Sequence, residues 1–106
     1  MDDLQRARAA LEKLKQTLQE NRLPIPNDQA RTEISRAISD LRGLDSYVSE
    51  KSGKISRMAE VYYSARKHQA YPGGPDRLYS DMLHDLCKRI RDQLDYLETL
   101  RKGREQ

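Results

Sequence analysis

Tryptophan and phenylalanine are absent from this sequence of 106 residues, and cysteine occurs only once, at Cys87. A single cysteine excludes a disulfide within the chain, and no group of cysteines and histidines has the spacing of a zinc site. We therefore expect no bound metal and a reducing, cytoplasmic environment. Cys87 itself falls on an apolar helical stripe, which is typical of a small core residue.

Long hydrophobic runs are absent as well. No apolar stretch approaches the roughly eighteen residues of a membrane span, and the acidic start of the chain does not resemble a secretion signal. The glycine pair Gly73-Gly74 is flanked by prolines and lacks the Lys-Ser/Thr of a phosphate-binding loop. We therefore expect no membrane contact, no cofactor, no small-molecule substrate and no enzymatic activity.

Charged residues make up 35% of the chain, and 20 lysines and arginines against 17 aspartates and glutamates leave a net charge of +3. The two signs alternate along the sequence, which is the pattern of solvated helix faces. Because hydrophobic residues amount to only 36%, the core of a lone monomer would be small and its stability modest. The composition favours an elongated helical protein stabilised by a second copy or a partner.

Periodic apolar residues predict a single all-α domain over residues 1–106, with helices over about 2–20, about 28–70 and about 75–102. In the first helix, leucines recur at spacings of three and four, as in the narrow seam of a coiled coil. This leucine seam consists of Leu4, Leu11, Leu14 and Leu18. It fits either packing within the chain or docking of a second copy or a partner helix.

The middle helix contains two glycines, Gly43 and Gly53, each of which weakens a helix interior by roughly 1 kcal/mol relative to alanine. The apolar phase nevertheless continues across both, so one long helix over 28–70 is the favoured prediction. The alternative is a helix end at Gly43, in the left-handed conformation, with the next leucine packing back. A bend there would close a four-helix bundle, whereas a continuous helix would leave apolar surface for a second copy.

The apolar stripes of the second and third helices match when the chain is folded as an antiparallel hairpin about Pro72-Gly73. The expected fold is therefore an elongated antiparallel helical hairpin plus an N-terminal helix, a three- or four-helix bundle with coiled-coil-like packing. At the closed end of this hairpin, four of the six tyrosines lie within residues 61–79 among several cations. Tyr62 and Tyr79 follow the apolar phase and are expected in the core.

The other aromatic and basic residues of this turn are predicted to form an exposed surface, which we call the hairpin-end patch. Its members are Tyr63, Arg66, Lys67, His68, Tyr71 and Arg77. Tyrosine gives contact area at low entropic cost, and arginine gives directional hydrogen bonds. The patch is predicted to bind an acidic protein segment or a phosphate backbone. The alternative is that its two tyrosines are ordinary surface residues.

The hairpin register places a second basic group along one side of the molecule. Lys54 and Arg57 would lie across from Arg91 and Lys88, and we call these four residues the basic stripe. Such a stripe could contact the phosphates of a nucleic acid, because each neutralised phosphate releases counterions. Acidic residues occur in the same region, so a solvated face with salt bridges is the alternative.

Arg77 and His84 are separated by six residues near the start of the last helix. This spacing resembles the Arg-x4–6-His motif of HEPN-type ribonuclease domains, which are small helical bundles that dimerise to assemble their site. The resemblance covers these two residues, and Leu78 stands where the family usually has a polar residue. It implies RNA cleavage by Arg77 and His84 as a remote alternative function.

Together these features predict a non-enzymatic helical interaction domain that acts as a small assembly or adaptor subunit or as a partner-binding chaperone. The expected partner is another protein, a second copy of the chain, or both, with a homodimer favoured over a monomer. The alternative function is a subunit of a larger complex that binds the backbone of a nucleic acid.

Overall fold

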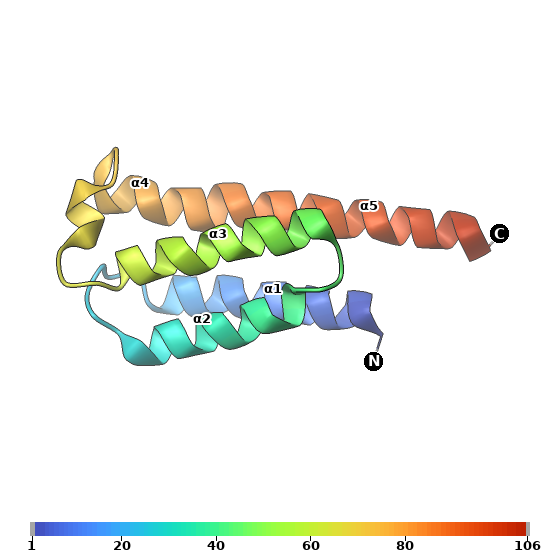
Figure 1. The fold of residues 1–106 in the computed structure, drawn as a ribbon, viewed down its shortest axis with the longest axis horizontal. Coiled ribbons are helices and arrows are strands. Elements are labelled where there is room, and N and C mark those ends of the chain that lie inside the picture. Colours follow the sequence, from blue (N-terminus) through green and yellow to red (C-terminus); the bar gives the residue numbers. More distant parts are fainter. Residues whose placement is uncertain (1, 106) are drawn as a thin grey trace.

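The computed structural model describes residues 2–105, with side chains for residues 2–103, and these residues form helices and turns without any strand. The elements are α1 (Asp3–Glu20), α2 (Asp28–Leu41), α3 (Ser46–Tyr62), a 3₁₀ turn (Lys67–Ala70), α4 (Gly74–Ser80), a π-helical turn (Asp81–Leu86) and α5 (Cys87–Glu105). The last three elements follow one another without a break, so the described residues form four helical rods (Figure 1). The all-α prediction is confirmed.

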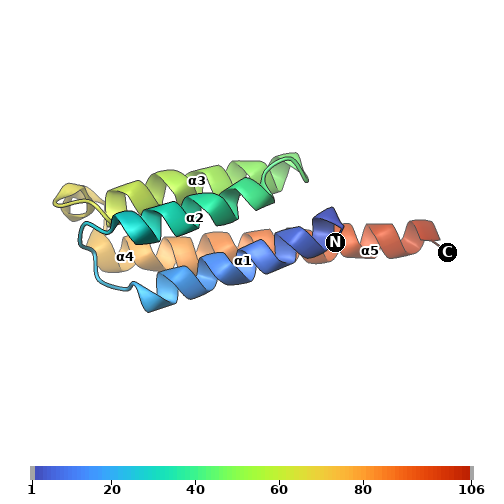
Figure 2. The ribbon, with the colours of Figure 1, turned by 90° about the horizontal axis from the view of Figure 1, so that it is seen from below.

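The four rods form an antiparallel bundle in which helices consecutive in the chain are neighbours. α1 packs against α2, α2 against α3, and α3 against the last rod, whose α5 segment closes the ring against α1. Seen from below, α2 and α3 form one layer, and α1 and the last rod form the other (Figure 2). Short connections between antiparallel neighbours are typical of an up-and-down four-helix bundle. The molecule measures 52 × 25 × 20 Å, and α5 extends beyond the other helices (Figure 1).

The first three helices each begin at a residue whose side chain caps the helix. Asp2, Asn27 and Asp45 each accept a hydrogen bond from the backbone amide three residues later, at 2.8, 3.0 and 3.1 Å. Amides in the first turn have no partner inside the helix, so these side chains stabilise the helix starts. The start predicted near residue 28 is therefore set by local sequence.

The middle of the chain is two helices, so the prediction of one long helix over 28–70 is wrong. α2 ends at Leu41, and Gly43 follows with a φ of +87°, a left-handed conformation that strains residues with a Cβ. Half-buried Leu44 then packs back against the core. Gly53, by contrast, lies inside α3 without interrupting it. The bend at Gly43 closes the four-helix bundle, as the alternative prediction required.

The core is one cluster of aliphatic side chains with a few tyrosines, as the composition predicted. The leucine seam belongs to this cluster, because Leu4, Leu11, Leu14 and Leu18 are all buried within the chain. The interpretation of the seam as a free docking surface is therefore corrected. The loop after α1 places α2 beside α1, and the bend at Gly43 folds α3 back so that α5 covers the other side of α1.

The π-helical turn changes the face on which the last rod presents its apolar residues. Leu78, Met82, Leu86, Ile90 and Leu94 are all buried, although they recur strictly every fourth residue. In an α-helix, each step of four residues would rotate the stripe by about 40°. A π-helical turn, with hydrogen bonds from residue i to i+5, holds more residues per turn and offsets part of this rotation. The whole stripe can therefore face the core.

Candidate functional site

Three tyrosines of the hairpin end lie inside the bundle and hold the end of α1. The hydroxyl groups of Tyr62, Tyr63 and Tyr79 each donate a hydrogen bond to a backbone carbonyl within residues 18–22. Carbonyls at the C-terminus of a helix lack the regular helical partners, and these hydroxyls bond to three carbonyls at or just after the end of α1, of which that of Leu18 also accepts from the amide of Asn21. The rings of Tyr62 and Tyr63 meet edge to face, with centroids 5.0 Å apart. This tyrosine cluster therefore has a structural role.

Tyr63 was predicted to be exposed in the hairpin-end patch, and this is wrong, because only 1% of the residue is accessible to solvent. Tyr63 is the C-cap of α3 and its amide still donates to Ala59, but its side chain reaches the end of α1, where the hydroxyl donates to the carbonyl of Asn21. Burial raises the pKa of Tyr63 above its ordinary value. Tyr63 is therefore removed from the candidate binding surface.

His68 was also predicted to be exposed, and it is buried instead, with 6% of the residue accessible. The helix expected to continue to about residue 70 gives way to the 3₁₀ turn Lys67–Ala70, which turns His68 inward. Within the described residues, its Nδ1 atom has no hydrogen-bond partner. Of the hairpin-end patch, Arg66 and Lys67 are exposed as predicted.

The remaining two members of the patch, Tyr71 and Arg77, meet at Asp81. The hydroxyl of Tyr71 donates a hydrogen bond to Oδ2 of Asp81 at 2.7 Å, and Nε of Arg77 donates to Oδ1 at 3.0 Å. The hydrogen bond from Tyr71 lowers the pKa of Asp81 and raises the pKa of Tyr71. The carboxylate is thus ionised, and Arg77 compensates its charge.

These residues border a groove of about 470 Å³ between α3 and the last rod, which we call the α3–α4 groove. Half-buried Met58 and buried Leu86 supply its apolar lining. Lys54 and Arg57 line it from α3. Tyr71, Arg77, Asp81 and Asp85 line it from the opposite side. The groove therefore brings half of the basic stripe together with two members of the hairpin-end patch.

The charge of this groove is positive once its ion pairs are counted. Asp85 accepts a hydrogen bond from Arg89 at 3.0 Å, and Asp81 is bound by Arg77 at the same distance. Lys54 and Arg57 form no ion pair with any described residue. Two cations without counter-charges therefore remain beside an apolar lining.

The other half of the basic stripe lies on a different face, so the prediction of one continuous stripe is wrong. Lys88 and Arg91 line a groove of about 370 Å³ between α1 and α5, which we call the α1–α5 groove. The α1 side of this groove includes Lys15, which the sequence did not single out. The hairpin register treated α5 as a partner of α3 alone, but α5 packs against α1 as well.

Arg77 and His84 also line different grooves, although seven residues of an α-helix span nearly two full turns and would keep both on one face. Arg77 borders the α3–α4 groove, whereas His84 borders the α1–α5 groove. The π-helical turn begins between them and rotates the helix face. The two side chains thus line no common groove within this chain, and RNA cleavage by them stays an untested prediction.

Cys87 lies in the wall of the α1–α5 groove and is buried. Burial raises the pKa of its thiol to about 12. The thiolate, which is the nucleophilic form, is therefore scarce at neutral pH. The prediction of a core cysteine is confirmed by its burial.

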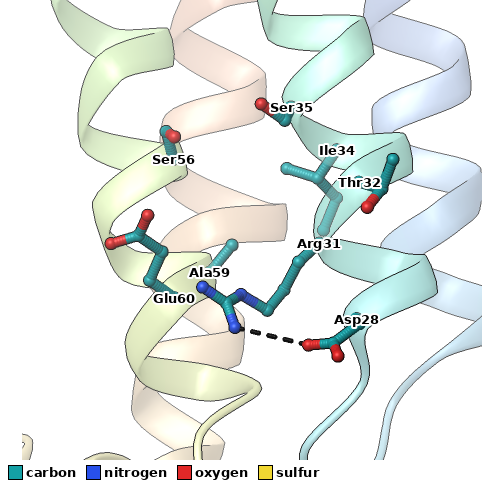
Figure 3. A pocket seen from close by; sticks show the side chains of 8 residues that line it. All are labelled: Asp28, Arg31, Thr32, Ile34, Ser35, Ser56, Ala59 and Glu60. Carbon is teal, nitrogen blue, oxygen red and sulfur yellow. Dashed lines mark ion pairs between the residues drawn. The ribbon is translucent and has the colours of Figure 1, made fainter.

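A further hollow of about 330 Å³ lies between α2 and α3 (Figure 3). Small side chains such as Ser35 and Ser56 leave this space open. The Arg31 side chain extends between Glu60 and Asp28, and it forms an ion pair with Asp28 at 3.5 Å (Figure 3). Its one cation is thus paired with an acid, so this hollow, unlike the α3–α4 groove, offers a ligand no cation without a counter-charge among its described lining residues.

Within residues 2–105, no group of three or more histidine, cysteine, aspartate or glutamate side chains is placed to hold a metal ion. None of the helices in the described part of the chain is long and apolar enough to cross a membrane. No family model, curated protein or solved structure matches the chain.

Proposed function

We propose that this chain is a non-enzymatic helical interaction domain that binds an acidic, partly apolar segment of a protein partner in the α3–α4 groove. This role suits a small assembly or adaptor subunit or a partner-binding chaperone. One observation carries the proposal: an apolar lining stands beside two cations, Lys54 and Arg57, that form no ion pair within the described residues.

The lining of the groove favours a protein segment. Met58 is half-buried and flexible, so its thioether can adapt to apolar side chains of different shape. A groove between two packed helices suits an amphipathic segment, which inserts its apolar side chains and keeps its polar face in water. Met58 and Leu86 would supply the apolar contact.

The charges of the groove favour an acidic segment. Lys54 and Arg57 are three residues apart, so they lie one helical turn apart on the same face of α3. Carboxylates of the partner would replace water around these two cations. Charges at the edge of an interface increase the association rate and select partners more than they increase affinity. The two residues would therefore select acidic partners and reject basic ones.

Photo-cross-linking in the native cell tests this proposal, because it captures whichever partner occupies the groove. Photo-reactive methionine replaces Met58 in the groove and Met82, which is fully buried in the core. After irradiation, mass spectrometry should find partner peptides attached at Met58 that are rich in acidic and apolar residues. Met82 should cross-link only within its own chain, which makes it an internal control.

Two charge-reversed variants give the matched comparison. Lys54→Glu/Arg57→Glu should reduce the cross-links at Met58 by roughly tenfold, the effect of about 1.4 kcal/mol of binding energy. Lys88→Glu/Arg91→Glu makes the same change of charge on the α1 side and should leave the cross-links at Met58 unchanged. Partner peptides that are basic, or equal losses in both variants, would contradict the proposal.

A further inference from the structure

Two cations of α1 lie on the face that is turned toward the last rod, and a third follows in the loop after the helix. They are Arg8 and Lys15, seven residues or nearly two helical turns apart, and Arg22 beyond the end of α1. At one end, two carboxylates bind Arg8, from Asp95 at 2.8 Å and from Glu98 at 2.9 Å. At the other end, the guanidinium of Arg22 lies 5.4 Å from the ring centroid of Tyr79.

The middle cation, Lys15, faces other cations instead of acids. It lines the α1–α5 groove opposite Lys88 and Arg91, and His84 lies on the same side as these two. No aspartate or glutamate is among the described residues that line this groove. The ion pairs of Lys15 and Arg91 are formed with exposed acids on their own helices, Glu12 at 3.7 Å and Asp92 at 3.3 Å.

Like charges that face each other across a groove repel, by about 1 kcal/mol for two unit charges 4 Å apart in water. The same helix pair binds Arg8 with two acids from the facing helix, whereas the acids that pair with Lys15 and Arg91 come from their own helices. We infer that the α1–α5 groove binds the phosphate backbone of a nucleic acid. The inference does not depend on the α3–α4 groove.

The arrangement of the cations favours a chain of phosphates over a single phosphate. Lys88 and Arg91 lie three residues apart along the last rod and Lys15 lies opposite them on α1, while His84 extends the polar row by one turn to about 10 Å. A row of cations matches a polyanion with repeated charges, because each neutralised phosphate releases counterions. No aromatic side chain is among the residues described as lining the groove, so bases would not stack there. Binding would therefore depend little on base sequence.

The lining of the groove argues against an acidic protein segment at this site. Its two apolar residues, Leu83 and Cys87, are both buried. They therefore offer a partner less contact area than half-buried Met58 does in the α3–α4 groove. Charge without apolar contact suits a phosphate backbone better than an amphipathic segment.

Fluorescence anisotropy with labelled single-stranded and duplex oligonucleotides tests the inference over a range of salt concentrations. Lys15→Gln/Lys88→Gln/Arg91→Gln and the control Lys54→Gln/Arg57→Gln/Lys67→Gln each remove three positive charges and so take the net charge from +3 to 0. The first variant should lose at least about tenfold in affinity. For single strands, the slope of log affinity against log salt concentration should become less steep by roughly 2, since each phosphate contact contributes about 0.7 to this slope. The control should lose less than about threefold in affinity, which is well below the loss expected for the first variant.

Three results would overturn the inference: no binding by the unmodified protein at low salt, equal weakening in both variants, or equally strong competition by polyglutamate. Circular dichroism checks that both variants stay folded. If the first variant unfolds, amide shift mapping on the unmodified protein decides the question. Nucleic acid should then shift the amides that border the α1–α5 groove, and shifts confined to α3 would contradict the inference.

Discussion

At the scale of single residues, the largest difference between the sequence-based prediction and the structure concerns the tyrosines of the hairpin end. The sequence singles out a cluster of tyrosines and cations at one turn, which suggested a binding surface. Tyr62 and Tyr79 lie in the core as predicted, but Tyr63 is buried beside them instead of exposed. All three bond to carbonyls at or just after the end of α1, which lie 40, 42 and 61 residues away in sequence. Such contacts depend on how the helices assemble, so local sequence patterns could not reveal them. Tyr71 remains half-buried in the α3–α4 groove.

The hydrogen bond of Tyr63 makes a measurable contribution to stability. Tyr63→Phe keeps the ring and removes the hydroxyl that donates to the carbonyl of Asn21 at 2.8 Å. We expect the free energy of unfolding to fall by about 1 kcal/mol, because a partly buried carbonyl loses this hydrogen bond. Urea denaturation measures this change. Tyr96→Phe is the control, since Tyr96 is 57% exposed, and it should change stability by less than about 0.5 kcal/mol. Equal losses in the two variants would show that the buried hydroxyl contributes nothing of its own.

At the scale of elements, the sequence predicted the helices whose limits depend on local residue patterns. The N-terminal helix over about 2–20 and the last helix from about 75 agree closely with α1 and with the rod that begins at Gly74. The bend at Gly43 could not be decided, because a glycine penalty of roughly 1 kcal/mol opposed a continuing apolar phase. Closure of the bundle, which is a tertiary effect, decides it.

The π-helical turn had a sequence signal that a search for helical periodicity alone does not use. Apolar residues recur at intervals of four through five positions from Leu78 to Leu94, which is too regular for an α-helix to keep on one face. The same turn separates Arg77 from His84, and contact of α5 with α1 moves Lys88 and Arg91 away from Lys54. The candidate site was therefore predicted only in part. The sequence shows which residue types lie near one another along the chain, but the face that each helix turns toward its neighbours is set by packing.

Two glycine substitutions of opposite effect test the bend. Gly43→Ala should cost about 1–3 kcal/mol, because its φ of +87° strains any residue with a Cβ, although space around it is open. Gly53→Ala should gain roughly 0.5–1 kcal/mol, because it lies within α3 and its Cβ would meet Arg57 at 3.6 Å, an ordinary contact. Thermal denaturation of both variants shows whether each substitution raises or lowers stability. Stabilisation by both would indicate one continuous helix in solution.

At the scale of the whole molecule, closure of the bundle removes the reason for expecting a dimer. That expectation arose because a continuous middle helix would leave apolar surface open. In the closed bundle, the large hydrophobic residues that are exposed in the described part of the chain are Leu23, Ile25, Tyr96 and Leu100. The first two lie in the loop after α1, and the last two lie on α5 toward the opposite end (Figure 1). They do not form one continuous surface.

We therefore expect the protein to be a monomer at micromolar concentrations. Stable dimers bury about 800 Å² on each partner, and the exposed apolar residues are divided between the two ends of the bundle. Light scattering coupled to size exclusion should give 12.4 kDa at every concentration tested. A mass that rises toward twice this value would contradict the expectation, and Leu100→Glu would then show whether the exposed end of α5 forms the contact. A dimer would also matter for function, because HEPN-type sites are assembled from two copies, so that Arg77 and His84 of different copies could meet.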